Sequence, residues 1–167
     1  MRLVGLAVLG LALAMPTWVS AAEKISGRAQ VIDARTLAVD GAKERVRLFG
    51  VDAPDRKQTC SNWANLKYRC GVNATHALAA IVGRNGQVTC EEQSRDKDGR
   101  VYAICKKGDD DIGAELIRRG WARDYVKYSH GRYAPQEAEA KQARRGAWAG
   151  KWKAPWKWRD EQHPAVQ

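Results

Sequence analysis

Residues 45–55, with the sequence R-V-R-L-F-G-V-D-A-P-D, constrain the fold most. The alternation of apolar and charged residues at the start of this segment predicts a β-strand that carries Arg47 on the face opposite its valine and leucine. A glycine then permits a bend, and Pro54 ends strand pairing. We expect Asp52 and Asp55 to lie close together at the exit of the strand, beside a cation. The simpler alternative is a charged turn after an ordinary strand.

Residues 25–31 also alternate, three further runs are bounded by turn signals, and three other segments have helical spacing, composition or a stop signal. We expect strands at residues 25–31, 36–39, 45–49, 87–94 and 100–106, and helices at residues 73–82, 112–119 and 135–147. Asn73 is a suitable N-cap for the first helix, and Gly120 is a suitable stop for the second. Five short strands with one helix after the third and two after the fifth predict an α+β, mainly β fold. This is a small five-stranded OB-type barrel with three helices.

The first residues have the pattern of a secretory signal peptide. A basic lead precedes an apolar run and then small residues, so we expect a leader at residues 1–21 with cleavage after Ala21 or Ala22. A retained membrane anchor is the alternative. We expect one domain at residues 22–159, a polar tail at residues 160–167, a monomer without stable membrane insertion, and a periplasmic or secreted location.

All four cysteines follow the leader, and an even count in an oxidising compartment indicates two disulfide bonds. Three connectivities are possible. Cys90 and Cys105 flank the turn at residues 96–99, and pairing of Arg95 with Arg100 would place them directly opposite each other. The remaining bond would then join Cys60 and Cys70. A zinc site is the alternative, but no cysteine pair has the spacing that zinc sites favour, and the three histidines are scattered.

The composition is strongly basic, with 29 lysine and arginine residues against 19 acidic residues and a formal net charge of +10. Such a charge favours anionic partners, namely nucleic acid, acidic polysaccharide or a membrane surface.

The order of several motifs resembles the staphylococcal nuclease (thermonuclease) family. The resemblance runs from about Gly27 to Arg159. The motifs are V-I-D-A-R-T-L at 31–37, R-L-F-G-V-D-A-P-D at 47–55, D-K-D-G-R at 96–100, L-I-R-R-G-W-A at 116–122 and A-R-R-G-A-W at 143–148. Members are OB-fold, calcium-dependent phosphodiesterases that cleave DNA and RNA.

The resemblance implies a site of two arginines, metal-binding aspartates and a glutamate. Arg47 and Arg100 correspond to the pair that holds the scissile phosphate, a role that suits planar guanidinium groups. Asp52 corresponds to one metal-binding aspartate, and calcium accepts such oxygen ligands. Asp55 takes the position of the glutamate that orients the attacking water.

Three positions depart from the family pattern. Arg35 replaces a metal-binding aspartate, and a guanidinium group only donates hydrogen bonds and cannot bind a cation. Asp55 is shorter than the glutamate by one C–C bond, roughly 1.5 Å. Asp98 replaces an aromatic residue that helps to hold the nucleotide. The metal site is therefore incomplete, and the sequence leaves open whether the chain is an enzyme.

We expect an exported protein that binds single-stranded DNA or RNA, or another polyanion, and whose calcium-dependent hydrolysis is weakened or lost. The expected binding residues are Arg35, Lys97, Tyr125 and Tyr128. We expect calcium as the cofactor if the protein is active, and we expect no cofactor if it is inactive. The alternatives are an active calcium-dependent nuclease and an envelope or exopolysaccharide-related binding protein. A further alternative is a merely structural ion-pair cluster of Arg47, Asp52 and Arg100. Trp148, Trp152 and Trp156 are expected to pin the C-terminus to the core.

Overall fold

The computed structural model describes residues 23–84 and 86–163. The expected leader and the last four residues of the expected tail lie outside this part of the chain. Among the described residues, no helix has the length and apolar character needed to cross a bilayer.

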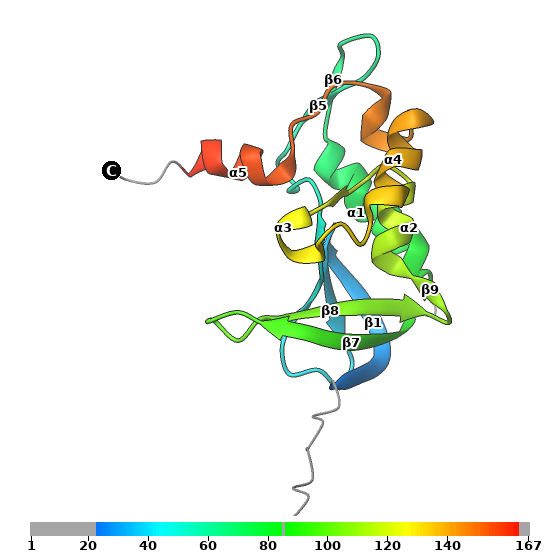
Figure 1. Ribbon diagram of the computed structural model, residues 1–167, viewed down its shortest axis with the longest axis vertical. Coiled ribbons are helices and arrows are strands. Elements are labelled where there is room, and N and C mark those ends of the chain that lie inside the picture. Colours follow the sequence, from blue (N-terminus) through cyan, green and yellow to red (C-terminus); the bar gives the residue numbers. More distant parts are fainter. Residues whose placement is uncertain (1–22, 85, 164–167) are drawn as a thin grey trace, which may run out of the picture.

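Five strands form a closed barrel, as the sequence predicted (Figure 1). They are β1 (Lys24–Asp33), β2 (Thr36–Val39), β3 (Val46–Leu48), β7 (Gln87–Arg95) and β8 (Val101–Lys107). Neighbouring strands pair in the order β3-β2-β1-β7-β8, and a parallel pairing of β3 with β8 closes the ring. Five short strands lie outside it: β4 (Val51–Asp52), β5 (Cys60–Ser61), β6 (Lys67–Tyr68), β9 (Asp110–Asp111) and β10 (Arg123–Asp124).

The β7–β8 hairpin brings Cys90 directly opposite Cys105, and the two form a disulfide bond. The register that we expected at the turn was wrong by one residue, because Arg95 pairs with Val101. An irregularity between Glu92 and Ser94 restores the cysteine pairing, since a bulge adds one residue to a strand. Cys60 and Cys70 form the second disulfide bond.

The first two helices cover one end of the barrel. Helix α1 spans Cys70–Val82 and begins three residues earlier than predicted, because the disulfide bond fixes its first residue. Asn73 is therefore inside the helix, where its backbone N–H already donates to the carbonyl of Arg69 at 3.2 Å. Helix α2 spans Ile112–Arg118, and Asp111 caps it by accepting a hydrogen bond from the Ala114 N–H at 3.0 Å.

The C-terminal third differs most from expectation. Helix α4 (Ala134–Gln142) ends well before residue 147, because Arg144 adopts a left-handed conformation with φ of 51°. The chain then docks on the end of α2, where the Ala147 N–H donates to the Gly120 carbonyl at 3.0 Å. The three expected helices are present as α1, α2 and α4. The structure adds α3 (Val126–Ser129), a 3-10 turn η1 (Gly146–Ala149) and α5 (Pro155–Gln162).

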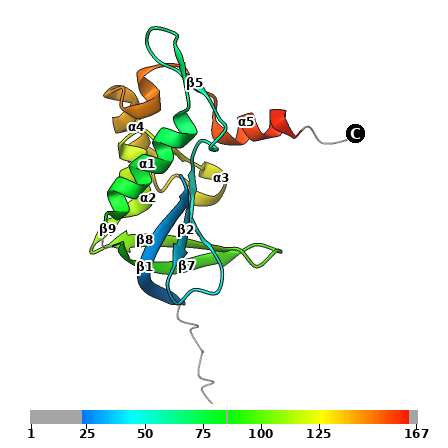
Figure 2. The same ribbon diagram turned by 180° about the vertical axis from the view of Figure 1, so that it is seen from behind.

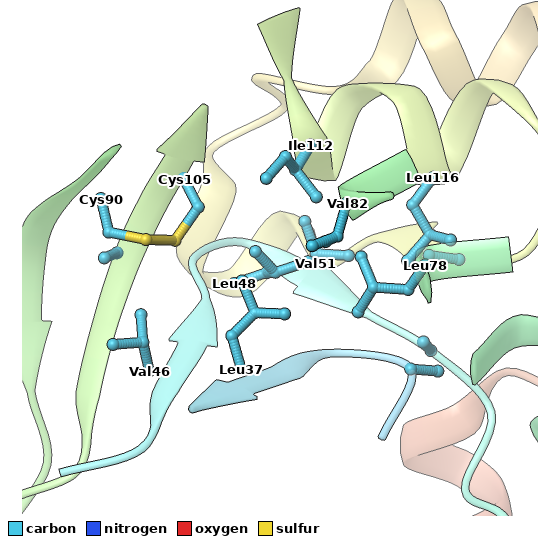
Figure 3. Packing of buried hydrophobic residues seen from close by; sticks show 14 of the residues in the cluster. Leu37, Val46, Leu48, Val51, Leu78, Val82, Cys90, Cys105, Ile112 and Leu116 are labelled. Carbon is cyan, nitrogen blue, oxygen red and sulfur yellow. A yellow bond between two sulfur atoms is a disulfide. The ribbon is translucent and has the colours of Figure 1, made fainter. Parts of the chain in front are cut away.

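The hydrophobic core fills the barrel and the space beneath the helices (Figure 3). Its large buried members are Leu37, Val46, Leu48 and Val51 from the strands, and Leu78, Val82, Ile112 and Leu116 from α1 and α2. This packing fixes the end of β3 and the start of β4, which carry the acidic residues of the site.

Candidate functional site

An open cavity of about 930 Å³ lies where β3 leaves the barrel. The β7–β8 hairpin, α3 and α5 also contribute to its walls, and α5 and the hairpin tip project on the same side of the molecule (Figure 1). The lining includes Arg35, Arg47, Asp52, Asp55, Arg100, Tyr125, Lys127, Tyr128, His130 and Arg159.

The backbone after β3 turns sharply and presents Asp52. Gly50 has φ of 67°, and a Cβ atom there would lie 2.7 Å from the Cβ of Ser129, so glycine is required by conformation and by space. Strand β4 then pairs with β10, with Asp52 opposite Arg123. The Asp52 side chain is only 2% exposed. A carboxylate this deeply buried needs cationic or hydrogen-bonding partners.

Arg35 supplies the first partner from the turn between β1 and β2. The turn is fixed because the Arg35 backbone N–H donates to Oδ1 of Asp33 at 2.9 Å. The Arg35 guanidinium donates from Nη1 to Oδ1 of Asp52, and its Nη2 lies 3.7 Å from Oδ1 of Asp55. We expected Arg35 to bind nucleic acid, and the sequence did not reveal this pairing.

Arg159 supplies the second partner from α5. Its Nη2 donates to Oδ2 of Asp52 at 2.7 Å, and its Nη1 donates to Oδ2 of Asp55 at 3.0 Å. Burial acts to lower the pKa of Arg159, but the hydrogen bonds and charges of the two carboxylates outweigh it and raise the pKa. The cluster of Arg35, Asp52, Asp55 and Arg159, called the ion cluster below, is neutral overall.

The residues present do not fit a calcium ion. Both oxygens of Asp52 accept hydrogen bonds from guanidinium groups, and the position of a second acidic ligand is taken by Arg35. Asp33 is engaged in its turn. Within residues 23–84 and 86–163, no three acidic, histidine or cysteine side chains gather in an arrangement that could hold a metal.

The two arginines expected to hold a phosphate differ in their surroundings. Arg47 lies on β3, is half-buried and lines the cavity, and it makes no ion pair with any described residue. Arg100 is exposed and is held by the hairpin turn, with Nε 2.8 Å from Oδ2 of Asp96 and Nη2 2.9 Å from Oδ2 of Asp98. Neither arginine pairs with Asp52. The structural ion-pair cluster that we considered, made of Arg47, Asp52 and Arg100, is therefore replaced by one in which Arg35 and Arg159 hold Asp52.

Aromatic rings line the side of the cavity next to α5. Tyr125 stacks on Trp156 with centroids 5.1 Å apart and an interplanar angle of 12°, and Tyr128 meets Tyr125 edge-on. Burial raises the pKa of Tyr125. Lys127 lies 5.5 Å above the Tyr128 ring. Lys97 is exposed at the hairpin tip and is not part of the lining.

A tryptophan cluster holds the chain that leads to α5. The guanidinium carbon of Arg123 lies 4.5 Å from the ring centroid of Trp148 and 4.7 Å from that of Trp152. Burial lowers the pKa of Arg123. Trp156, on α5, stacks on Tyr125, and this contact places the start of α5 at the rim of the cavity. These contacts attach the C-terminal segment to β10, as expected for a tryptophan-rich tail.

Comparison with known proteins agrees with this architecture. Residues 45–150 match the family described as staphylococcal nuclease homologue, which is more than half of the chain. The chain belongs to the staphylococcal nuclease family. One protein that this chain resembles in sequence is the succinoglycan biosynthesis protein ExoI of Rhizobium meliloti (strain 1021). It is 38% identical over 138 residues, which cover 82% of this chain and 71% of ExoI.

Two further relatives carry nuclease names. An uncharacterized endonuclease of Escherichia coli is 28% identical over 149 residues, covering 86% of this chain and 90% of that protein. The probable staphylococcal-like nuclease CAN3 of Oryza sativa subsp. japonica is 31% identical over 127 residues, covering 75% of this chain and 31% of CAN3. The chain is thus a nuclease-like protein of this family.

The family match ends at residue 150, whereas α5 and Arg159 follow it. Sequence reasoning missed Arg159 and Trp156 as parts of the site, and it did not include His130, which lines the cavity. No spacing rule connects Arg159 with Asp52, because 107 residues separate them. The sequence offered one signal, which is that Arg35 stands where the resemblance implies a metal-binding aspartate.

Proposed function

We propose that this nuclease-family protein binds single-stranded nucleic acid or another polyanion without calcium, and that its phosphodiester hydrolysis is weakened or lost. The observation that carries the proposal is the pairing of Asp52 with Arg35 and Arg159. In this arrangement guanidinium groups take the place of the metal. Their hydrogen bonds to carboxylates use the atoms that a hard cation would need.

The remaining cations of the cavity provide the binding chemistry. Since the ion cluster is neutral, the half-buried Arg47, which makes no ion pair with any described residue, is available to a phosphate. Tyr125 and Tyr128 offer ring surfaces beside it, and base stacking on such rings does not depend on sequence. Arg100 contacts the bound phosphate only by exchanging its hydrogen bonds to the carboxylates of Asp96 and Asp98 for hydrogen bonds to that phosphate.

The same geometry opposes hydrolysis. A residue that orients water needs a free acceptor directed at that water. Asp55 is shorter than the family's glutamate and has both oxygens near guanidinium nitrogens, at 3.0 and 3.7 Å. A misplacement of about 1 Å is enough to lower a rate about 100-fold.

Binding of a fluorescent single-stranded oligonucleotide in EDTA tests the proposal. Arg47→Gln should weaken binding by about tenfold, the effect of one charge-assisted hydrogen bond. Arg28→Gln is the matched control, because Arg28 is an exposed arginine on β1 outside the cavity lining. Binding that requires calcium, or equal losses for the two variants, would contradict the proposal.

Anionic polysaccharide is a second candidate ligand. The observation that favours it is the 38% identity to ExoI, a protein named for succinoglycan biosynthesis. A cavity that presents Arg47 without a metal would accept a carboxylate as it accepts phosphate. Competition of succinoglycan against the oligonucleotide decides between the ligands, and tighter binding of the polysaccharide would assign it as the substrate class.

We further propose that the protein is exported to the periplasm or secreted, after removal of residues 1–21, and acts as a monomer. Two disulfide bonds support an oxidising compartment. Fractionation of cells and size-exclusion chromatography of the product test these points.

A further inference from the structure

The loop between β5 and β6 exposes two large apolar side chains. Trp63 is 83% exposed and Leu66 is 66% exposed, more than Val126 at 58% and Tyr128 at 48%. Both ribbon views show this loop extending beyond the rest of the molecule, at the end opposite β7 and β8 (Figures 1 and 2). Trp63 and Leu66 are not part of the cavity lining, so the proposed function does not use them.

The loop is rigid, which makes this exposure a persistent feature. The Cys60–Cys70 disulfide bond closes its base, and Ser61 exchanges two backbone hydrogen bonds of 2.9 Å with Lys151. At its tip, Oδ1 of Asn62 accepts hydrogen bonds from the N–H groups of Ala64 and Leu66 at 2.9 and 3.0 Å. These bonds hold the loop backbone in the conformation that exposes both apolar side chains.

Basic residues flank the tip along the chain. No acidic residue occurs between Arg56 and Cys70. The segment contains Arg56, Lys57, Lys67 and Arg69, and Lys151 is bridged to Ser61. The loop thus combines a protruding apolar tip with basic flanking residues.

We propose that this loop attaches the protein reversibly to a lipid bilayer that contains anionic headgroups. Tryptophan rings favour the membrane–water interface, leucine gains free energy from burial among acyl chains, and neighbouring lysines and arginines are attracted to anionic lipids. Nucleic acid fits the tip less well, because single strands are bound along grooves with successive stacking rings and an aliphatic side chain offers no such face. Attachment is peripheral, through the tip alone.

Co-sedimentation of the purified protein with vesicles tests the proposal. The probes are vesicles of phosphatidylcholine alone and vesicles that also contain phosphatidylglycerol. We expect binding only to the second kind. The double variant Trp63→Ala/Leu66→Ala should lower the partition coefficient at least about tenfold. Val126→Ala, a change at another exposed apolar residue, should leave it unchanged.

A charge variant makes the test independent of the apolar change. Lys67→Gln/Arg69→Gln should also weaken vesicle binding by about tenfold or more, and Lys24→Gln/Lys43→Gln, which removes two exposed lysines elsewhere, should have little effect. Oligonucleotide binding should be the same for both tip variants and the wild type. Absence of vesicle binding, or a loss of oligonucleotide binding in the tip variants with vesicle binding intact, would overturn the proposal.

Discussion

Arg159 donates a hydrogen bond from Nη2 to Oδ2 of Asp52 at 2.7 Å, across 107 residues of sequence. The helix that carries Arg159 follows the segment that matches the staphylococcal nuclease family, yet its guanidinium reaches the centre of the site. Together with Arg35 it converts a carboxylate suited to calcium into the acceptor of two guanidinium groups. The predictions below test this arrangement and the fold that supports it.

Asp52→Asn should lower the free energy of unfolding by about 3 kcal/mol, because loss of one partner leaves buried charges uncompensated. The value lies at the low end for buried ion pairs, since the Arg159 side chain is 27% exposed. The same variant should bind the oligonucleotide more tightly, because the cavity gains one positive charge. Urea unfolding and fluorescence anisotropy give the two readouts. Asp110→Asn on exposed β9 is the control, and equal stability of the two variants would contradict the ion cluster.

Calcium binding should appear when the guanidinium groups are replaced. Arg35→Asp with Asp55→Glu adds one ligand and restores the length of the water-orienting acid, but Arg159 still occupies Oδ2 of Asp52. The addition of Arg159→Gln should therefore strengthen calcium binding further, measured by isothermal titration calorimetry. Arg28→Asp is the matched charge control and should bind no calcium. Equal calcium affinity with and without Arg159→Gln would argue against the role of Arg159 in keeping calcium from Asp52.

The disulfide bonds should account for a large part of the stability. Serine at both Cys90 and Cys105 should lower the free energy of unfolding by about 3 kcal/mol, the value for a closed loop of 15 residues. The Cys60–Cys70 bond closes a separation of 10 residues and should contribute slightly less. Urea unfolding measures both. Peptide mapping without reduction should recover these two links, and a Cys60–Cys90 link would be incompatible with the barrel.

The hairpin tip should loosen in acid through Asp96. Burial acts to raise the pKa of Asp96, but hydrogen bonds from the Arg100 and Asp98 backbone and the Arg100 guanidinium outweigh it, so the pKa is lowered. The stabilising contribution is then fully present above the unfolded pKa of about 3.9 and is lost as the pH falls through the lower folded value. Carboxyl NMR titration of Asp96 should show the low pKa, and Arg100→Gln should move it upward. An unmoved pKa would show that Arg100 does not hold the turn.

The barrel could be predicted because the segments at residues 25–31 and 45–49 have the period of two of half-buried strands, and turn signals bound the other three strands. The last helix was extended too far, because its residues favour helix and nothing local marks the left-handed turn at Arg144. The register at Arg95 was wrong because a bulge leaves no alternation signal. Arg35 was recognised as a change in the site, but its pairing with Asp52 and the entry of Arg159 depend on tertiary packing.

The central claim is that guanidinium groups have replaced calcium in this site. Cleavage of single-stranded DNA by the purified protein, measured with calcium and with EDTA, tests it most directly. We expect cleavage to be weak or undetectable and no faster with calcium than with EDTA, while the oligonucleotide still binds in EDTA. Rapid degradation of DNA in calcium that EDTA abolishes would show that a metal displaces Arg35 and Arg159 from Asp52, and would contradict the claim.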